Sequence, residues 1–231
     1  MGRYPASEEV DQEYLNAMGP ELGRFYRLLS NECQALYVDW VEYKDLFGKN
    51  PERIDLLNEA APEFFGRLQD TLWERTLLQV ARLMDAPSSG VGKDNVTLRR
   101  LQDLVDSTTR DRIKILLKYA QETCAFSKDW RDRFIAHRDL NLAQRGNAKQ
   151  LEAANRLDVD SALKAIAAVL NEVESHYCNG RIVGYESFHS PLGAIALLDV
   201  LQEGLDTRAA AMERLRSGRP LPEDFAPKRA I

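Results

Sequence analysis

The stretch from Gly19 to Gly48, GPELGRFYRLLSNECQALYVDWVEYKDLFG, decides the fold class of this chain. A proline suits the first turn of a helix, so the expected helix begins at Gly19-Pro20 and ends at Gly48. Its apolar residues recur at spacings of three and four, the pattern of an amphipathic helix with one face in a core. Aromatic residues can also stack on nucleic-acid bases, but at this helical period we interpret the stripe as packing. The stripe consists of Leu22, Phe25, Tyr26, Leu29, Cys33, Leu36, Tyr37, Trp40, Tyr43 and Phe47.

A second long stripe follows after a short break. Asn50-Pro51 supplies a capping residue and a first-turn proline, and the helix that it begins is interrupted at Ala61-Pro62 because proline disfavours helix in its predecessor. Two long stripes joined by short connections predict an antiparallel helical bundle. The stripe between Pro62 and about Asp85 consists of Phe64, Phe65, Leu68, Leu72, Thr76, Leu77, Val80 and Met84.

The second half of the chain continues the helical pattern. We expect one helix capped by Thr108-Thr109, one over 158–177 that ends at Asn179-Gly180, and one that starts at Ser190-Pro191 and weakens towards Ser217. Only 181–189 has strand-like content, and it is too short and solitary to define a sheet. The fold class is therefore all-α.

Length and composition indicate how this helical chain is organised. With 231 residues and 44% hydrophobic residues, it has material for one full-sized core or for a core with an appended segment. We predict a single helical domain over 19–217, an N-terminal extension over 1–18, and a flexible tail over 218–231, where prolines accumulate.

Charge and cysteine usage restrict the function classes and the compartment. The formal net charge of -5 does not favour nucleic-acid binding by the surface as a whole, so any RNA would need a local basic groove. The three cysteines form no Cys-x-x-Cys pair, so we expect buried thiols in a reducing compartment and no metal site. The start of the chain lacks the apolar run of a signal peptide, and no stretch reaches the ~18 apolar residues of a membrane span. We therefore expect a cytoplasmic protein without a membrane segment.

One short stretch carries the chemistry, WRDRFIAHRDLN from Trp130 to Asn141. It holds an arginine, a polar residue, four further residues and a histidine, which are Arg131, Asp132 and His137. An arginine can bind a phosphate, and a histidine can move protons near pH 7. Together they indicate cleavage of RNA without a metal.

Helix geometry places a condition on this pair. In one straight α-helix, the six residues from Arg131 to His137 would rotate the chain by about 600° and advance it by about 9 Å, leaving the side chains roughly 120° apart. Either the helix bends near the histidine, or a second copy of the protein completes the site. A homodimeric site follows as a hypothesis.

Several segments besides this motif resemble the HEPN superfamily, specifically its AbiU-type abortive-infection branch. The resemblance extends over roughly residues 20 to 200, and its breadth matters because the arginine–histidine motif is short. The resembling segments are Trp40–Gly48, Ile54–Asn58, Ala81–Asp85, Gly92–Leu98 and Ile135–Asp139.

The resemblance implies a fold, an activity and roles for residues. The fold would be an antiparallel helical bundle of the HEPN type with extra peripheral helices. The activity would be metal-independent RNA cleavage, without a cofactor, in phage defence or a toxin–antitoxin setting, by a homodimer whose motifs face each other across a cleft. Arg131 would hold the scissile phosphate, His137 would act as general acid or base, and Asp132 would orient one of them. The residues expected to bind RNA along the groove are Lys128, Arg133 and Arg138.

Other interpretations of the same residues stay open. Arg131 is also what a solvated cation or an ion-pair partner looks like, and His137 could simply complement a helix dipole. A silent binding module for RNA, a nucleotide or a protein partner is the main alternative function. The chain could also be the neutralised half of a toxin pair with an antitoxin or nucleotidyltransferase partner. Asp139 fits a helix cap. His176 and His189 have no catalytic or metal-binding residues beside them in the sequence.

Overall fold

The computed structural model describes residues 7–137, 139–144, 149–188, 190 and 192–225, which form helices joined by turns and loops, without a β-strand among them. The nearest approach to sheet structure is a single antiparallel bridge between Ser88 and Asp94. The predicted all-α fold is confirmed. The strand-like segment 181–189 contains the 3-10 turn η3 (Tyr185–Ser187), and its last residue lies outside the described part.

The chain divides into two compact units. The first comprises Met1–Trp40 and Thr71–Phe188, and the second comprises Val41–Asp70 and His189–Ile231. Two helices contribute to both units, α2 (Pro20–Phe47) and α4 (Pro62–Leu83). None of the helices in the described ranges is long and apolar enough to cross a lipid bilayer.

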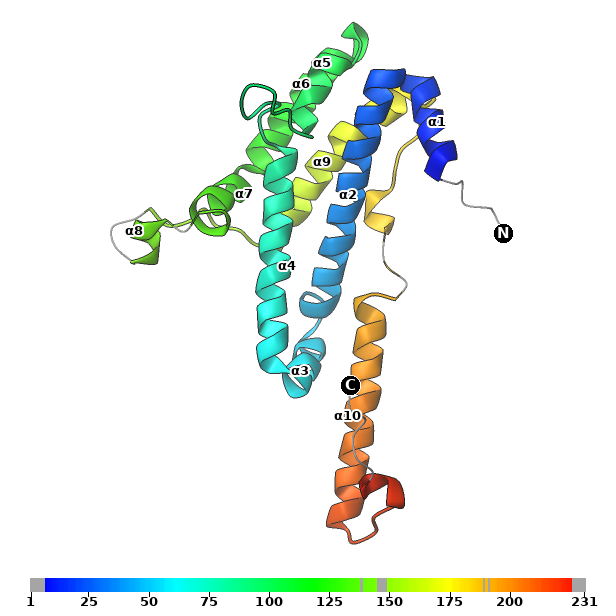
Figure 1. The fold of residues 1–231 in the computed structure, drawn as a ribbon, viewed down its shortest axis with the longest axis vertical. Helices are drawn as coiled ribbons and strands as arrows, with labels where there is room; N and C mark the ends of the chain where they lie inside the picture. Colours follow the sequence, from blue (N-terminus) through cyan, green and yellow to red (C-terminus); the bar gives the residue numbers. More distant parts are fainter. Residues whose placement is uncertain (1–6, 138, 145–148, 189, 191, 226–231) are drawn as a thin grey trace. The chain divides into compact units, whose positions relative to one another are not determined.

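The first unit contains the helices that lead into the arginine–histidine motif. Besides its parts of α2 and α4 it contains α1 (Ser7–Met18), η1 (Leu98–Arg100), α5 (Leu101–Leu104), α6 (Ser107–Thr123), α7 (Ala125–Trp130), η2 (Arg131–Ile135), α8 (Leu140–Ala143) and α9 (Arg156–Tyr177) (Figure 1). Helices α6 and α9 pack against each other along much of their length. The indole of Trp40, which is buried, donates a hydrogen bond to Asp160 at the start of α9 (2.7 Å). The helices therefore enclose one core.

The predicted apolar stripes on α2 and α4 supply buried residues to both units. Of the stripe on α2, all residues but Phe25 are buried, and Phe25 is half-buried. On α4, Phe65, Leu77 and Val80 are buried. The inclusion of Phe64 was wrong, because 54% of this residue is exposed. Phe64 and Phe65 are adjacent, and a helix turns by about 100° between neighbours, so only one of them faces the core.

Short polar side chains cap several helix starts, some of them where the sequence predicts and some not. Asn50 caps α3 (Pro51–Ala60) by accepting a hydrogen bond from the backbone of Arg53. Asn155 forms a reciprocal capping box with Asp158 at the start of α9. The predicted cap of α6, Thr108-Thr109, was wrong. The cap is Asp106, whose side chain accepts from the backbone N–H groups of Thr108 and Thr109.

One ionic cluster lies inside the first unit. Glu174 on α9 is fully buried, and one of its carboxylate oxygens accepts hydrogen bonds from Arg181 and from the Tyr14 hydroxyl (3.4 Å). Arg181 also pairs with Glu13 of α1 and lies over the Tyr14 ring, 5.3 Å from its centre. Burial, and then the charge of Glu174, raise the pKa of Tyr14 to about 12. This cluster fastens α1 to the core.

The second unit is built around α3 and α10 (Ala194–Arg216), which pack against each other. Glu42 of α2 accepts a hydrogen bond from the first backbone N–H of α10. The helix begins at Ala194, four residues after the expected start at Ser190. After α10, the 3-10 turn η4 (Pro222–Phe225) is held by an ion pair between Arg214 and Asp224. The predicted flexibility of 218–231 is a statement about motion and stays a prediction.

Candidate functional site

The motif begins where α7 gives way to a wide turn. Helix α6 ends at Thr123, and α7 carries the chain to Trp130. Over η2 the backbone is π-helical, and the N–H of Ala136 donates to the carbonyl of Arg131 at 2.8 Å, a bond between residues five apart. His137 follows in a bend outside the helix. The motif is therefore not one straight α-helix, and of the two alternatives the helix does bend near the histidine.

Arg131 is held by two carboxylates from different parts of the chain. Its Nε donates to Asp132 at 2.7 Å, and its Nη1 donates to Asp85, which follows the end of α4. These hydrogen bonds, the Asp132 bond first, raise the pKa of Arg131 above its usual value. The arginine side chain is 18% exposed, against 33% for Asp85 and 46% for Asp132. The guanidinium is thus fixed in place and reachable from solvent mainly on the Asp132 side.

Asp85 was not among the predicted site residues. It occurs only as the last residue of the resembling segment Ala81–Asp85, so that segment was the one available signal. Its backbone is fixed by the buried Thr97, whose hydroxyl lies 2.9 Å from the carbonyl oxygen of Leu83 and 2.8 Å from that of Asp85. A threonine 12 residues further along the chain therefore places the carboxylate that contacts Arg131.

Arg133 fastens the segment that follows the motif. It forms an ion pair with Asp129 (3.2 Å) and donates to the backbone carbonyls of Lys149 and Gln150. Asp129 in turn accepts from the N–H of Glu152 at 2.9 Å. These contacts give Arg133 a structural role, so binding RNA would require it to exchange one of them.

Trp130 also holds the segment that follows the motif. Its indole N–H donates to the carbonyl of Glu152 at 2.9 Å, and its ring meets Phe134 edge-on with ring centres 5.6 Å apart. Asp139 caps α8 by accepting from the N–H of Leu142, which confirms the helix-cap interpretation. The motif is thus framed by local hydrogen bonds before and after His137.

The remaining predicted residues differ in what surrounds them. His137 is exposed and, among the described residues, makes no hydrogen bond or ion pair, so the single chain does not join it to Arg131. The Lys128 side chain is also exposed and has no ion-pair partner in the described ranges. Arg138 lies outside the described residues. One chain thus presents an anchored cation at Arg131 and an open imidazole at His137.

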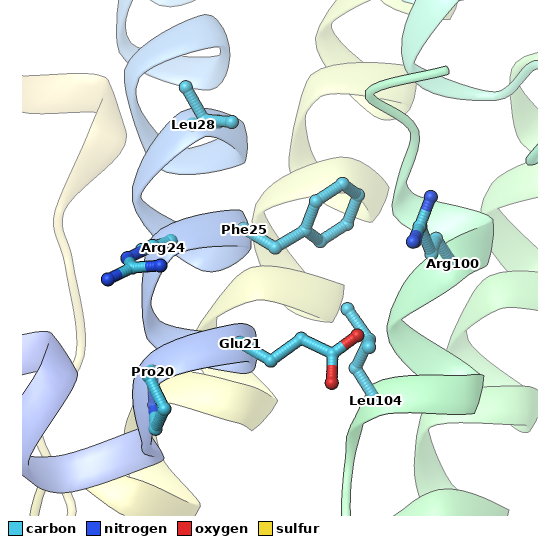
Figure 2. Close-up of a pocket in the computed structure, with 7 residues that line it drawn as sticks. All are labelled: Pro20, Glu21, Arg24, Phe25, Leu28, Arg100 and Leu104. Atoms are coloured by element: carbon cyan, nitrogen blue, oxygen red, sulfur yellow. The ribbon is translucent and has the colours of Figure 1, made fainter. Parts of the chain in front are cut away.

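An open pocket of about 430 Å³ lies elsewhere in the first unit. Figure 2 shows the Phe25 ring pointing from α2 towards Arg100 and Leu104, and the Arg100 guanidinium lies 5.5 Å from the centre of that ring. Arg100 is also paired with Asp94 at 3.0 Å. The lining contains no residue of the motif, so this pocket is separate from the candidate site. It is lined by Pro20, Glu21, Arg24, Phe25, Leu28, Arg100 and Leu104.

Other ionisable clusters in the described residues do not form a metal centre. No group of three or more histidine, cysteine or acidic side chains in those ranges is arranged to hold an ion. Cys33 and Cys124 are buried, and burial raises the pKa of the Cys124 thiol to about 12. His176, for which the sequence suggested no partner residues, contacts the carboxylate of Asp106 at 2.8 Å. Because Asp106 is also the cap of α6, this contact joins the ends of α9 and α6.

Comparison with known proteins gives one match. The HEPN family described as AbiU2 matches residues 19–191, which is well over half of the chain and includes α2, α4 and the motif. No curated protein and no solved structure matches. With its helical core and the arginine–histidine motif inside the matched region, this chain belongs to the AbiU2 family of HEPN domains, a family associated with abortive infection.

Proposed function

We propose that this protein is a metal-independent endoribonuclease that acts in phage defence or in a toxin–antitoxin setting. The observation that carries the proposal is an anchored Arg131 at the start of a π-helical turn and an exposed His137 just after it, in a chain of the AbiU2 family. π-Turns inside helices are frequent at functional sites. Here the turn brings the chain out of the helix before His137, so the imidazole faces solvent, where a substrate would lie.

The proposed roles follow from the chemistry of RNA cleavage. The transition state carries extra negative charge on the phosphate, which a guanidinium stabilises best when it is already oriented. Asp85 and Asp132 orient Arg131, and Asp132 is the more exposed of the two. Because Nη1 and Nε of Arg131 make these contacts, a phosphate would approach Nη2 or displace Asp132. His137 would take the proton of the 2′-hydroxyl or protonate the leaving oxygen.

The proposal includes a homodimer. His137 makes no contact with Arg131 within one described chain, so a second copy facing the first would supply the complementary group. Lys128, Arg133 and Arg138 would then contribute cations from both copies to a groove for the RNA backbone. The proposal also includes an antitoxin or a nucleotidyltransferase as a further partner.

A silent RNA-binding module is the second candidate, and one observation favours it. Arg131 is neutralised by two carboxylates, so the local cluster carries a surplus of negative charge. Phosphate binding must compete with both acids. If they are never displaced, the fold would hold RNA through its other cations without cutting it.

Cleavage of a fluorescent single-stranded RNA with excess chelator tests the proposal. We expect cleavage by the unaltered protein and none above background by Arg131→Ala or His137→Ala. Matched controls are Arg24→Ala, an exposed arginine on α2, and His176→Ala, a histidine outside the motif. If both motif variants cut RNA as fast as the controls, the nuclease proposal is wrong; if they still bind RNA that no variant cuts, the binding module stands instead.

A further inference from the structure

The basic residues expected along the RNA groove supply fewer available cations than the sequence suggested. Arg133 is bound to Asp129 and to backbone carbonyls, and Arg138 lies outside the described residues. Lys128 is exposed and has no ion-pair partner in the ranges that the structure describes. Most of a protein's affinity for RNA comes from several phosphate contacts. A groove therefore needs cations from outside the motif.

The segment 82–100, which includes the end of α4, is basic within an acidic chain. It contains four basic residues and two acidic ones, whereas the whole chain has a formal net charge of -5. Arg100 pairs with Asp94 at 3.0 Å, and Asp85 binds Arg131. The other three basic residues make no ion pair with any described residue, so their charge is available to a ligand. These three are Arg82, Lys93 and Arg99.

Hydrogen bonds connect two of these cations to the carboxylate that holds Arg131. The N–H of Asp85 donates to the carbonyl of Arg82 at 3.2 Å. The Thr97 hydroxyl lies 2.8 Å from the carbonyl oxygen of Asp85 and accepts from the N–H of Arg99 at 3.4 Å. The backbones of Arg82 and Arg99 therefore lie beside Asp85, on either side of it.

Lys93 belongs to a closed turn of the same segment. An antiparallel bridge joins the ends of residues 88–94. Below the bridge, the Asn95 side chain donates to the carbonyl of Ala86 at 2.8 Å, and Ala86 directly follows Asp85. The exposed Lys93 is therefore presented by a turn whose base is fixed next to the same carboxylate.

A phosphate bound to Arg131 would need cations near Asp85. Nη1 of Arg131 donates to Asp85, and Nη2 is attached to the same guanidinium carbon, so a phosphate on Nη2 would lie beside the Asp85 carboxylate. The carboxylate repels the phosphate, and at 33% exposure it is open to solvent. Cations on both sides of it offset this repulsion and can bind the phosphates of neighbouring nucleotides.

We propose that Arg82, Lys93 and Arg99 form a basic tract that binds the backbone of single-stranded RNA next to the scissile phosphate. This inference rests on the proposed ribonuclease function and names where the substrate continues beyond Arg131. Phosphate contacts carry no sequence information, so the tract adds affinity without base preference. Its role is substrate binding, and the chemical step stays with the motif.

RNA affinity at several salt concentrations tests the tract in a His137→Ala background, in which the RNA stays uncut. The tract variant carries Arg82→Gln, Lys93→Gln and Arg99→Gln together. We expect binding of a 16-nucleotide RNA at about 0.1 M salt to weaken by at least about tenfold, and the log–log salt slope to become shallower by about 2, at about 0.7 for each lost contact.

The matched control removes the same charge from elsewhere in the first unit. It carries Arg24→Gln, Lys118→Gln and Lys164→Gln, three exposed side chains of α2, α6 and α9. Its affinity should stay within about twofold of the unaltered protein, and its slope within about 0.7. Circular dichroism and urea unfolding check that both variants keep the fold.

Cleavage kinetics with His137 restored separate substrate binding from an effect on Arg131. We expect the tract variant to raise KM and to keep kcat, because uniform binding of the RNA backbone is lost. A fall in kcat at unchanged KM would show that the segment acts through Asp85, and would overturn the tract. Equal behaviour of the tract and control variants would also overturn it, while cleavage by both would leave the ribonuclease proposal standing. If the unaltered protein neither binds nor cuts RNA, both proposals are wrong.

Cross-linking tests the tract without changing it. A single-stranded RNA that contains 4-thiouridine is irradiated with the His137→Ala protein, and the cross-linked tryptic peptides are identified by mass spectrometry. We expect cross-links in the peptides 83–93 and 94–99, which end at two of the three cations. Cross-links confined to other peptides would contradict the tract. That result, together with unaltered RNA affinity, is the one expected if the three cations bind an acidic protein partner instead.

Discussion

Two arginines of the first unit are each held by two carboxylates, and the two regions differ in how deeply those carboxylates are buried. Arg181 binds Glu174, which is fully buried, together with Glu13 of α1. Arg131 binds Asp85 and Asp132, which are 33% and 46% exposed. A buried carboxylate cannot turn to water when its cation leaves, whereas an exposed one can. We therefore expect Arg181 to keep its carboxylates permanently, and we expect Arg131, if the protein acts on RNA as proposed, to exchange a carboxylate for a phosphate.

The largest expected effect separates activity from stability in the Arg131 region. His137→Ala should lower RNA cleavage by about 10²–10⁴-fold, because general acid–base catalysis contributes that much to rate. Its free energy of unfolding should change by less than about 0.5 kcal/mol, since the side chain is exposed and no contact to it is described. Single-turnover cleavage and urea unfolding measure the two quantities. If His137→Ala lost activity together with a large loss of unfolding free energy, the comparison between the two regions would fail.

The second prediction addresses stability in the Arg181 region. Arg181→Met keeps the aliphatic length of the side chain, but it leaves Glu174 buried without its cation, so we expect about 3 kcal/mol of destabilisation. The matched change Arg131→Met should cost less than about 1 kcal/mol, because its carboxylates are exposed. Urea unfolding compares the two variants.

A double variant sharpens this result. Adding Glu174→Gln to Arg181→Met removes the uncompensated charge, so part of the lost stability should return. If the second substitution instead adds a further loss, then packing, not the buried charge, holds this region.

A third, exposed carboxylate supplies an intermediate case. Asp106→Ala removes the cap of α6 and should cost about 1 kcal/mol at neutral pH. Hydrogen bonds from the Thr108 hydroxyl, from His176 and from the Thr109 N–H hold the pKa of Asp106 below its usual value. A lowered pKa means that the carboxylate stabilises the fold above the unfolded-state pKa of about 3.9 and loses this effect as pH falls further.

Unfolding of Asp106→Ala and the unaltered protein at several pH values checks the sign. The gap between them should be widest near neutral pH and should close in acid below about pH 3.9. Asp111→Ala, which removes an equally charged, exposed side chain of α6, is the control and should show no such gap. A gap that widens on acidification would contradict the lowered pKa.

The smallest effect concerns RNA affinity. Asp132→Asn frees Arg131 from one negative neighbour, so in a His137→Ala background we expect about threefold tighter RNA binding and a salt dependence steeper by about 0.7 in log–log slope. Asp103→Asn, an exposed acid on α5, is the control. Fluorescence anisotropy at several salt concentrations measures both. Weaker binding would show that Asp132 orients Arg131 more than it competes for it.

Much of the fold was predictable because local chemistry sets the helix ends. Pro20, Pro51 and Pro62 each open a helix where the sequence predicts it, since proline fits the first turn and disfavours its predecessor. The cap of α6 was misplaced because Asp106, Thr108 and Thr109 are all capping residues. Only the backbone shows which side chain accepts. Phe64 was misjudged because periodicity alone does not say which of two adjacent aromatics faces inward.

Of the candidate site, the sequence predicted only the residues within the stretch from Trp130 to Asn141. The sequence presents Arg131 and His137 as a pair, and the bend between them was one of two stated alternatives. Asp85 could not be found in the same way, because its contact with Arg131 joins residues 46 positions apart and depends on how α4 ends. Arg133 was expected along the groove, but its contacts with Asp129 and the backbone of Lys149 form only once the following segment has folded back.

The start of α10 brings together two positions that are far apart in the sequence, Gly193 and Glu42. A side chain at Gly193 would place its Cβ against the carboxylate of Glu42, which also accepts from the first N–H of the helix. Mutation of either position alone therefore removes the anchor, because a side chain at position 193 would displace the flexible end of Glu42. Among homologues, we expect glycine before this helix wherever the glutamate is kept, and a smaller or uncharged residue on α2 wherever the glycine has been replaced.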